Sequence, residues 1–359
     1  MVTVIDLFSG CGGLSLGAAR SGMAPSLAIE LDDHAAAAHS TNFPKCQTAK
    51  ADIAKIDPTY IQSFYKGRAD LVIGGPPCQG FSYIGKRNEN DPRNDLLDRF
   101  FQLVATLKPR AFMMENVPGL LDHSSVHLLK NGLERIAKNY TILTPTILDA
   151  SDFGGATRRR RVVVIGYDPT DVDDITIQQI VQNQAQITTV SQALIGLPEP
   201  AGSDVAKVQK HGSPYEKLVN RKIKGIGNPS KLKAYDAGNV SGFLATKHSS
   251  LVVGRFSETN PGETEKTSRF FRLHPDQPAR TLRAGTGADR GSFQSARPIH
   301  HSSPRVISVR EAARIQGFPD WFDFHHTKWH SHRMIGNSVN PLFAEAILTS
   351  IADALGIKN

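Results

Sequence analysis

Cysteine is scarce in this 359-residue chain, which contains only Cys11, Cys46 and Cys78. Three cysteines cannot form the disulfide framework of a small secreted protein, and they do not make up a zinc-binding set. The cysteine content therefore predicts a protein of a reducing compartment, the cytoplasm. It also leaves each thiol free for packing or for chemistry.

Long apolar runs are missing as well. No stretch approaches the ~20 residues of a membrane-spanning helix, and the first residues, 1–6, have neither the basic start nor the apolar core of a signal peptide. Hydrophobic residues nevertheless make up 40% of the chain. That content supports a sizeable core, and the length allows two domains. We expect a globular cytosolic protein without a membrane partner.

Acidic residues are in deficit in one part of the chain. The net charge is +8, but the segment Val205–His300 alone has 17 lysines and arginines against 7 acids, so the remainder is slightly acidic. One basic segment on a near-neutral body is typical of a surface that faces a polyanion such as nucleic acid. A solvated basic face would have the same composition, so charge alone leaves both interpretations open.

Two common phosphate-binding loops are also absent. The apolar run Val2–Ile5 predicts a first strand, which leads through a glycine-rich turn at 6–13 into a helical stretch, Leu14–Ser21. This turn is neither the GxGxxG of dinucleotide-binding proteins nor a phosphate loop ending in Gly-Lys-Ser or Gly-Lys-Thr. The unit is therefore an α/β strand–turn–helix without pyrophosphate-binding machinery.

Acids follow the next two strands. Glu30 ends the strand Ser26–Ile29, and Asp52 ends a third unit. An acid about 20 residues after the glycines can accept hydrogen bonds from both hydroxyls of a ribose, and Asp52 suits an adenine amino group. Such a nucleoside pocket fits S-adenosylmethionine better than a dinucleotide. A turn shaped only for helix–strand packing is the alternative.

The loop around Cys78 is the strongest signal of chemistry. The apolar run Leu71–Ile73 predicts a buried strand, and Gly74-Gly75-Pro76-Pro77 follows it directly. The two prolines make the loop stiff, so a thiol is held at the carboxyl end of a strand, where an α/β enzyme places a nucleophile. The alternative is a buried structural cysteine.

Two further charged groups adjoin predicted core strands. Glu115 ends the strand Ala111–Met114, and four arginines at 158–161 precede the strand Val162–Gly166. Successive side chains of a strand point to opposite faces, so Arg159 and Arg161 share one face. That pair can point into a site while the other two arginines are solvated.

At this point the sequence resembles the cytosine-C5 DNA methyltransferases. Six blocks occur in the order of that family. They are Asp6–Gly13, Gly75–Gln79, Glu115–Val117, Arg159-x-Arg161, Arg310–Pro319 and Gly336–Pro341. The family usually has Pro-Gln where this chain has Ala156-Thr157, so no role is carried over from that glutamine.

The resemblance implies a covalent mechanism. Cys78 matches the nucleophile that adds to carbon 6 of cytosine, so that carbon 5 becomes nucleophilic. Glu115 matches the carboxyl group that contacts N3 and the exocyclic amine. Arg161, supported by Arg159, would bind O2, hold Glu115 and stabilise the thiolate. Because the thiol cannot reach a base inside a duplex, the cytosine must be flipped out of the DNA.

The resemblance and the basic segment together indicate binding residues. The S-adenosylmethionine pocket would use Phe8, Gly10, Gly12, Glu30, Asp52, Pro77, Leu96, Asn337 and Val339. DNA would be bound by residues of the cysteine loop, of the polar stretch after it and of the basic segment, namely Gln79, Ser82, Lys86, Arg87, Arg280, Thr281, Arg283 and Arg290.

The expected fold is a Rossmann-like methyltransferase sheet with helices on both faces, plus a smaller loop-rich, mainly β target-recognition domain. We expect a catalytic domain at 1–168, the recognition domain at 169–304, and a return to the catalytic domain at 305–359. Ser308 with Glu311 predicts a helix start, and the last helix should begin at Asn340 and end near Gly356. Between them lie His325, His326, His330 and His332; they lack a clear thiol or carboxylate partner, so we expect no metal.

The favoured function is a DNA cytosine-C5 methyltransferase, acting as a monomer in a bacterial cytoplasm on nucleoid DNA, beside an independent restriction endonuclease. Methylation of cytosine in tRNA is the first alternative, although the Cys-Phe-Thr motif of that branch is absent because no cysteine follows Cys78. A sequence-specific DNA-binding protein without catalysis is the second alternative. A dinucleotide-dependent oxidoreductase is disfavoured by the missing GxGxxG.

Overall fold

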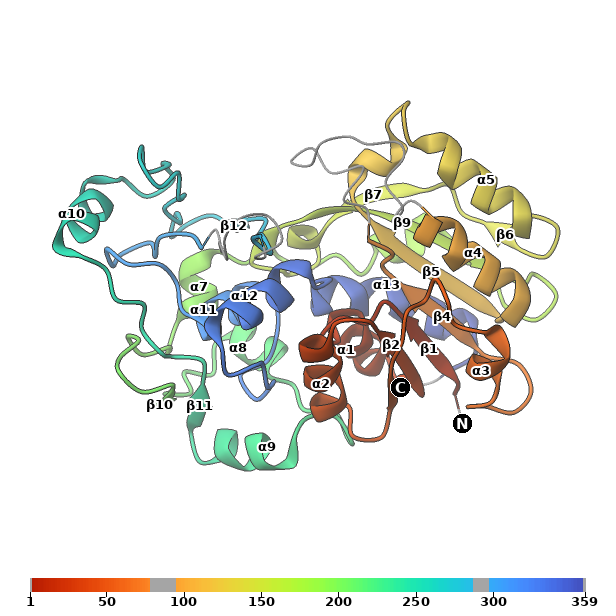
Figure 1. The fold of residues 1–359 in the computed structure, drawn as a ribbon, viewed down its shortest axis with the longest axis horizontal. Coiled ribbons are helices and arrows are strands. Elements are labelled where there is room, and N and C mark those ends of the chain that lie inside the picture. Colours follow the sequence, from red (N-terminus) through yellow and green to blue (C-terminus); the bar gives the residue numbers. More distant parts are fainter. Residues whose placement is uncertain (1, 78–94, 287–296, 358–359) are drawn as a thin grey trace.

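The computed structural model describes residues 2–77, 95–286 and 297–357. Within these residues, an eight-stranded sheet forms the centre, with the order β3–β2–β1–β4–β5–β9–β6 and with β7 also paired to β9 (Figure 1). Strands β1 to β5 run parallel, whereas β9 is antiparallel to β5, β6 and β7. The strands are β1 (Val4–Leu7), β2 (Leu27–Glu30), β3 (Gln47–Lys50), β4 (Leu71–Gly74), β5 (Ala111–Asn116), β6 (Thr141–Ile142), β7 (Thr146–Asp149) and β9 (Arg160–Tyr167).

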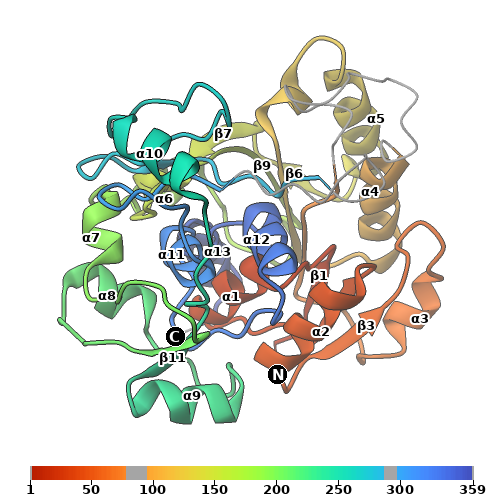
Figure 2. The same ribbon diagram turned by 60° about the vertical axis from the view of Figure 1, so that its left-hand side comes forward.

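Helices cover both faces of this sheet (Figure 2). One face packs with α1 (Gly13–Arg20) and α13 (Pro341–Ala354), and the other with α4 (Asp95–Leu107) and α5 (Val126–Ile136). Helices α2 (Asp33–Asn42) and α3 (Pro58–Gln62) follow β2 and β3. Strand β4 illustrates why both faces are buried: its side chains alternate between the two cores, so a continuous apolar run is required.

The predicted fold class is confirmed, with shifts at several element ends. The first strand begins at Val4 and not at Val2. Residues 141–149 form two short strands, β6 and β7, and not a single continuous one. Pro145 lies between them, and proline lacks the N–H that a strand would donate to its neighbour.

The segment 169–304 is loop-rich, as predicted, but the expected predominance of strands is wrong for its described residues. Its strands are only β10 (Val205–Lys207), β11 (Asn239–Ser241) and β12 (Ala279–Arg280). Most of its regular structure is helical, in α6 (Ile177–Val181), α7 (Val190–Leu194), α8 (Pro214–Val219), α9 (Pro229–Asp236) and α10 (Ser250–Glu258). A serine, threonine or asparagine caps the start of each helix. These caps are local sequence signals, but the many glycines and prolines of the segment led to a prediction of loops and short strands.

The C-terminal part returns to the sheet. Helix α11 (Val309–Ile315) begins with the predicted capping box of Ser308 and Glu311, and Asn340 caps α13 as predicted. Helix α12 (Lys328–Asn337) lies between them, near the middle of the molecule in Figure 1, with α10 far to the left and α4 and α5 on the right.

The core of the sheet also includes residues beyond 168. Val172, Ile175 and Ile180 belong to the apolar cluster that α13 forms with the sheet. The division into 1–168, 169–304 and 305–359 stays a prediction. Among the described residues, no helix is both long enough and apolar enough to span a membrane.

Candidate active site

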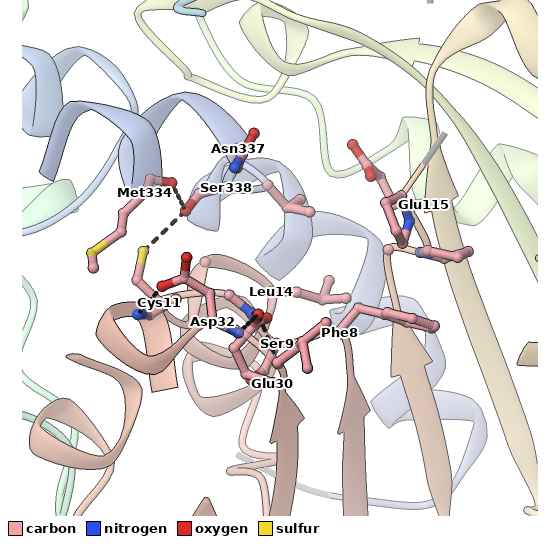
Figure 3. A pocket seen from close by; sticks show the side chains of 18 of the residues that line it. Phe8, Ser9, Cys11, Leu14, Glu30, Asp32, Glu115, Met334, Asn337 and Ser338 are labelled. Atoms are coloured by element: carbon pink, nitrogen blue, oxygen red, sulfur yellow. Dashed lines mark hydrogen bonds between the residues drawn. The ribbon is translucent and has the colours of Figure 1, made fainter. Parts of the chain in front are cut away.

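A cavity of about 480 Å³ opens at the carboxyl ends of β1, β2, β4 and β5. This is the edge at which α/β proteins with parallel sheets bind their ligands. Figure 3 shows Glu30 and Phe8 in one part of the cavity and Glu115 in another, with Asn337 and Ser338 on a third side. The cavity therefore brings together residues from both ends of the chain.

Most of the predicted cofactor residues line this cavity. They are Phe8, Gly10, Glu30, Asp52, Pro77, Leu96, Asn337 and Val339. Gly12, the remaining one, is not a lining residue. It has a left-handed backbone (φ 104°), and a Cβ there would lie 2.3 Å from Cε2 of Phe43, so this glycine permits the turn to pack on α2 and the residue after it.

Glu30 is held by backbone N–H groups. Its Oε2 accepts from Gly10 at 2.7 Å, and its Oε1 accepts from Leu31 at 2.9 Å and from Asp32 at 2.8 Å. Burial raises the pKa of Glu30, and these N–H groups oppose the rise. The carboxylate is thus preorganised at the cavity, and it also closes the turn after β1.

Several lining residues were not predicted. Leu31, Asp32 and Ile53 directly follow the predicted acids, and alternation along the strand ends could have indicated them. His330, Arg333 and Met334 come from α12, and no sequence pattern placed that helix beside β1. Other lining residues include Ser9, Leu14, Ala35, Ala51 and Ser338.

Cys11 is a packing residue, buried against the end of α12. Its Sγ lies 3.1 Å from Oγ of Ser338, and burial raises the pKa of the thiol to about 12. A thiol with such a pKa stays protonated and unreactive at neutral pH. Cys11 therefore helps to shape the cavity wall without providing a nucleophile.

Glu115 and Arg161 form an ion pair at the end of β5 and the start of β9. Nε of Arg161 lies 2.7 Å from Oε1 of Glu115, and both side chains are about nine-tenths buried. Oε1 accepts no hydrogen bond of suitable geometry in the described residues, so its contact with Arg161 is electrostatic. The carboxylate thereby keeps hydrogen-bonding capacity for a ligand in the cavity.

Arg159 is more deeply buried than Arg161, and it also lines the cavity. Its Nη1 donates to the carbonyl of Gly336 at 3.0 Å and its Nη2 to that of Asn337 at 3.3 Å. Burial, and then the charge of Arg161, lowers the pKa of Arg159 to about 9. As expected from strand alternation, Arg158 and Arg160 are exposed on the other face.

The loop after β4 starts beside Glu115. A Cβ on Gly75 would lie 3.3 Å from Oε2 of Glu115, and Nδ2 of Asn116 donates to the carbonyl of Pro76 at 3.3 Å. This approach leaves little room for a side chain at position 75. Cys78, Gln79, Ser82, Lys86, Arg87 and Arg290 lie outside the described residues.

Two of the predicted DNA-binding residues of the basic segment, Arg280 and Thr281, lie next to Arg158. Strand β12 pairs in parallel with β8 (Thr157–Arg158), with Arg280 opposite Arg158. Oγ1 of Thr281 donates to the carbonyl of Arg158 at 2.7 Å. The exposed guanidinium of Arg280 lies over the ring of Phe271, 3.8 Å from its centre. The basic segment therefore packs on β8, the strand that directly precedes the cavity residue Arg159.

Three residues of the histidine-rich stretch lie together with His34. The ring centre of His34 is 3.9 Å from that of His330 and 4.5 Å from that of His325, and the ring of His325 also contacts that of His326 at 4.1 Å. His332 is buried elsewhere. In the part of the chain that the structure describes, no three histidine, cysteine or acidic residues are arranged to hold a metal ion.

These features define a Rossmann-like fold with a cavity at the carboxyl ends of its parallel strands and a glutamate–arginine pair in the cavity wall. The sequence profile of the C-5 cytosine-specific DNA methylases matches residues 2–353, and the chain belongs to this family. Sequence relatives cover almost the whole chain.

Two relatives illustrate this similarity. Type II methyltransferase M.XorII of Xanthomonas oryzae pv. oryzae is 39% identical, across 99% of this chain and 85% of that protein. Type II methyltransferase M1.HphI of Haemophilus parahaemolyticus is 31% identical, across 98% of this chain and 86% of that protein.

Solved structures agree in fold. A crystal structure of a prophage-encoded E. coli protein, assigned as a DNA modification methyltransferase, superposes with a TM-score of 0.88 at 39% identity, covering 99% of this chain and 100% of that one. The S. pombe Dnmt2 methyltransferase has a TM-score of 0.64 at 16% identity, covering 99% of each chain. The second likeness concerns the fold alone.

Proposed function

We propose that this protein transfers the methyl group of S-adenosylmethionine to carbon 5 of a cytosine flipped out of duplex DNA, as a Type II modification enzyme. The observation that carries the proposal is the Glu115–Arg161 pair, which lines the same cavity as the backbone-held Glu30. One part of the cavity suits a nucleoside, and the other suits a pyrimidine with adjacent donor and acceptor groups.

The residues present fit S-adenosylmethionine. The cavity volume lies in the range of small-molecule sites. Glu30 would accept from the ribose hydroxyls and Asp52 from the adenine amine, while Phe8, Leu96 and Val339 supply apolar walls. When bound, the cofactor supplies a methyl group on a positively charged sulfur. The exposed Leu31, 61% accessible, is suited to cover a purine face.

The chain's own groups would act on the cytosine. Cys78 is the proposed nucleophile toward carbon 6, and its loop starts beside Glu115, which supports this assignment. Glu115 would hold a proton at N3 and accept from the exocyclic amine, so the ring becomes electrophilic as the thiolate adds. Arg161 would donate to O2 and keep Glu115 in place, with Arg159 supporting it.

Recognition of DNA would fall to the basic segment. Arg280 and Thr281 lie beside β8, which supports contact of these residues and of the nearby Arg283 with the DNA beside the flipped base. The matching family is described as DNA methylases, and M.XorII and M1.HphI are described as Type II methyltransferases, which favours DNA over tRNA. We further propose that the enzyme acts as a monomer on nucleoid DNA in a bacterial cytoplasm, beside an independent endonuclease.

A covalent trap tests the whole proposal. Wild-type protein, S-adenosylmethionine and a pool of duplex DNA containing 5-fluorocytosine are mixed, with matching tRNA in parallel, and adducts stable to denaturation are sought. Fluorine at carbon 5 blocks elimination, so the enzyme stays attached to its substrate. We expect a DNA adduct that is absent in Cys78→Ser and present in Cys46→Ser.

The alternatives give different results in the same assay. An adduct with tRNA alone would replace the DNA substrate by an RNA substrate. Tight DNA binding without any adduct or methyl transfer would identify a binding protein that lacks catalysis. Omitting S-adenosylmethionine, or replacing it by its demethylated product, should abolish incorporation of labelled methyl groups.

A further inference from the structure

Two cations converge on one hydroxyl between the basic segment and α12. Nη1 of Arg297 donates to Oγ1 of Thr246 at 2.9 Å, and Nζ of Lys328 lies 3.4 Å from the same oxygen. Lys328 also donates to the carbonyl of Ala245 at 2.9 Å. Each of the three side chains is partly accessible, so a ligand can reach them from solvent. We refer to this group as the Thr246 cluster.

The Thr246 cluster has no negative charge of its own in the described residues. Neither Arg297 nor Lys328 forms an ion pair with a carboxylate there. Burial lowers the pKa of Arg297, and burial together with the charge of Arg297 lowers that of Lys328. Two partly desolvated cations close to each other are unfavourable unless an anion joins them.

A buried histidine near the cluster has a ring nitrogen that lacks a hydrogen-bond partner among the described residues. His332 follows Lys328 by one helical turn on α12, and its Nε2 has no hydrogen-bond partner in the described part of the chain. Burial, and then the charges of Arg297 and Lys328, lowers the pKa of His332 to about 3, so the ring is neutral. A neutral ring beside two cations can donate one N–H to an anion without adding charge.

Helix α12 separates the Thr246 cluster from the active-site cavity. His330, Arg333 and Asn337 line the cavity, whereas Lys328 and His332 do not. Neither Thr246 nor Arg297 lines it. The cluster is therefore distinct from the cofactor pocket, but it is carried by the same helix.

We propose that the Thr246 cluster binds one phosphate of the DNA backbone, through Arg297, Lys328 and the Thr246 hydroxyl. The inference rests on the proposed function, since it takes DNA as the partner. A phosphate matches two cations and neutral donors, and its contact carries no base information. By holding the strand on α12, the cluster would set the distance between the DNA and the cofactor pocket.

The test measures how DNA binding depends on salt. Binding of a fluorescent duplex of mixed sequence is followed by anisotropy over a range of NaCl concentrations for wild type, Arg297→Gln, Lys328→Gln and the double variant. We expect the double variant to bind about tenfold more weakly at physiological salt. The slope of log affinity against log salt should fall by about 0.9, the value for one lost phosphate contact.

A matched control removes a charge outside the basic segment. Lys66, between α3 and β4, is exposed and makes no ion pair in the described residues, so Lys66→Gln should keep the wild-type slope. Because the cluster repels itself in the free protein, the cluster variants should melt at the wild-type temperature or above it. The loss of a purely structural contact would instead lower the melting temperature.

Three outcomes separate the proposals. Unchanged affinity and slope in the double variant would overturn the phosphate site while leaving methyl transfer intact. Weakened binding of S-adenosylmethionine with unchanged DNA binding, measured by calorimetry, would assign the cluster to the cofactor and overturn it too. A wild type that binds DNA through this cluster but never methylates it would overturn only the proposed function.

Discussion

Arg161 and Glu115 meet across neighbouring antiparallel strands, with Nε and Oε1 2.7 Å apart. In the register of β5 and β9, Glu115 is opposite Val163. Arg161 lies two residues before Val163 on β9, and its long side chain extends along the strand to the carboxylate of Glu115. The contact is nearly closed to water, and it leaves Oε1 without an aligned hydrogen bond in the described residues. The pair is thus held in place but remains available to a substrate.

The first prediction concerns this carboxylate. In Glu115→Gln the side chain keeps its shape but can no longer carry the proton that assists addition to the ring. We expect kcat for methyl transfer to fall by about 10²- to 10⁴-fold, with little change in cofactor affinity. Glu134→Gln, at an exposed position of α5, is the control and should retain full activity. Equal activity of both variants would remove Glu115 from the reaction.

The second prediction separates two adjacent arginines. Lys in place of Arg159 keeps a charge but cannot reach both carbonyls, of Gly336 and Asn337. We expect binding of S-adenosylmethionine to weaken about tenfold and the free energy of unfolding to fall by about 1–3 kcal/mol. Arg160→Lys, on the exposed face, should change neither quantity. Calorimetry and denaturant unfolding provide the measurements, and equal behaviour of both variants would contradict the prediction.

The third prediction uses Gly336, where the basic segment touches α12. A Cβ there would lie 2.5 Å from the backbone of both Arg283 and Ala284. Gly336→Ala must therefore displace a backbone segment, at a cost of about 1–3 kcal/mol. We expect kcat/KM for DNA to fall more than cofactor affinity.

Gly254 in α10 offers the matched control for that glycine. A Cβ at this position meets nothing within 4 Å, so Gly254→Ala should leave activity unchanged. It should even stabilise the protein by about 0.5–1 kcal/mol, because alanine favours the helix. Normal DNA kinetics in Gly336→Ala would show that this close contact does not matter for recognition.

The fourth prediction concerns stability and pH. Asp6 in β1 is fully buried and accepts from Oγ of Ser15 at 2.5 Å. Burial, the largest cause, raises its pKa from 3.8 to about 7. The folded protein then binds this proton more tightly than the unfolded chain. Its contribution to stability is therefore complete below pH 3.8 and is lost as the pH rises to about 7.

Comparison with Asp6→Asn isolates this contribution. Burial lowers the pKa of His39 and His332 to about 3 and that of His300 to about 4, so these groups give the opposite slope in both proteins. We expect the unfolding free energy of wild type minus that of Asp6→Asn to decline between pH 4 and pH 7 and then to level off. A difference independent of pH, in denaturant titrations, would refute the assignment.

Much of the fold could be predicted because its signals are local. The runs before Glu30, Cys78 and Glu115 predicted buried parallel strands, and the family blocks identified the enzyme class. Exposure of Arg158 and Arg160 followed from strand alternation alone. The expected predominance of strands in the segment 169–304 was wrong, because helix caps are short signals among many glycines and prolines.

The sequence by itself determined which helices and strands form around the candidate site, because apolar periodicity, caps and tight turns act over a few neighbouring residues. It also predicted which residues of those elements carry chemistry. Only the tertiary structure decided which of these residues meet. Neither the pairing of β12 with β8 nor the convergence of Arg297 and Lys328 on Thr246 has a local signature. The partners are separated by many residues, so their contact depends on how the helices and strands pack together.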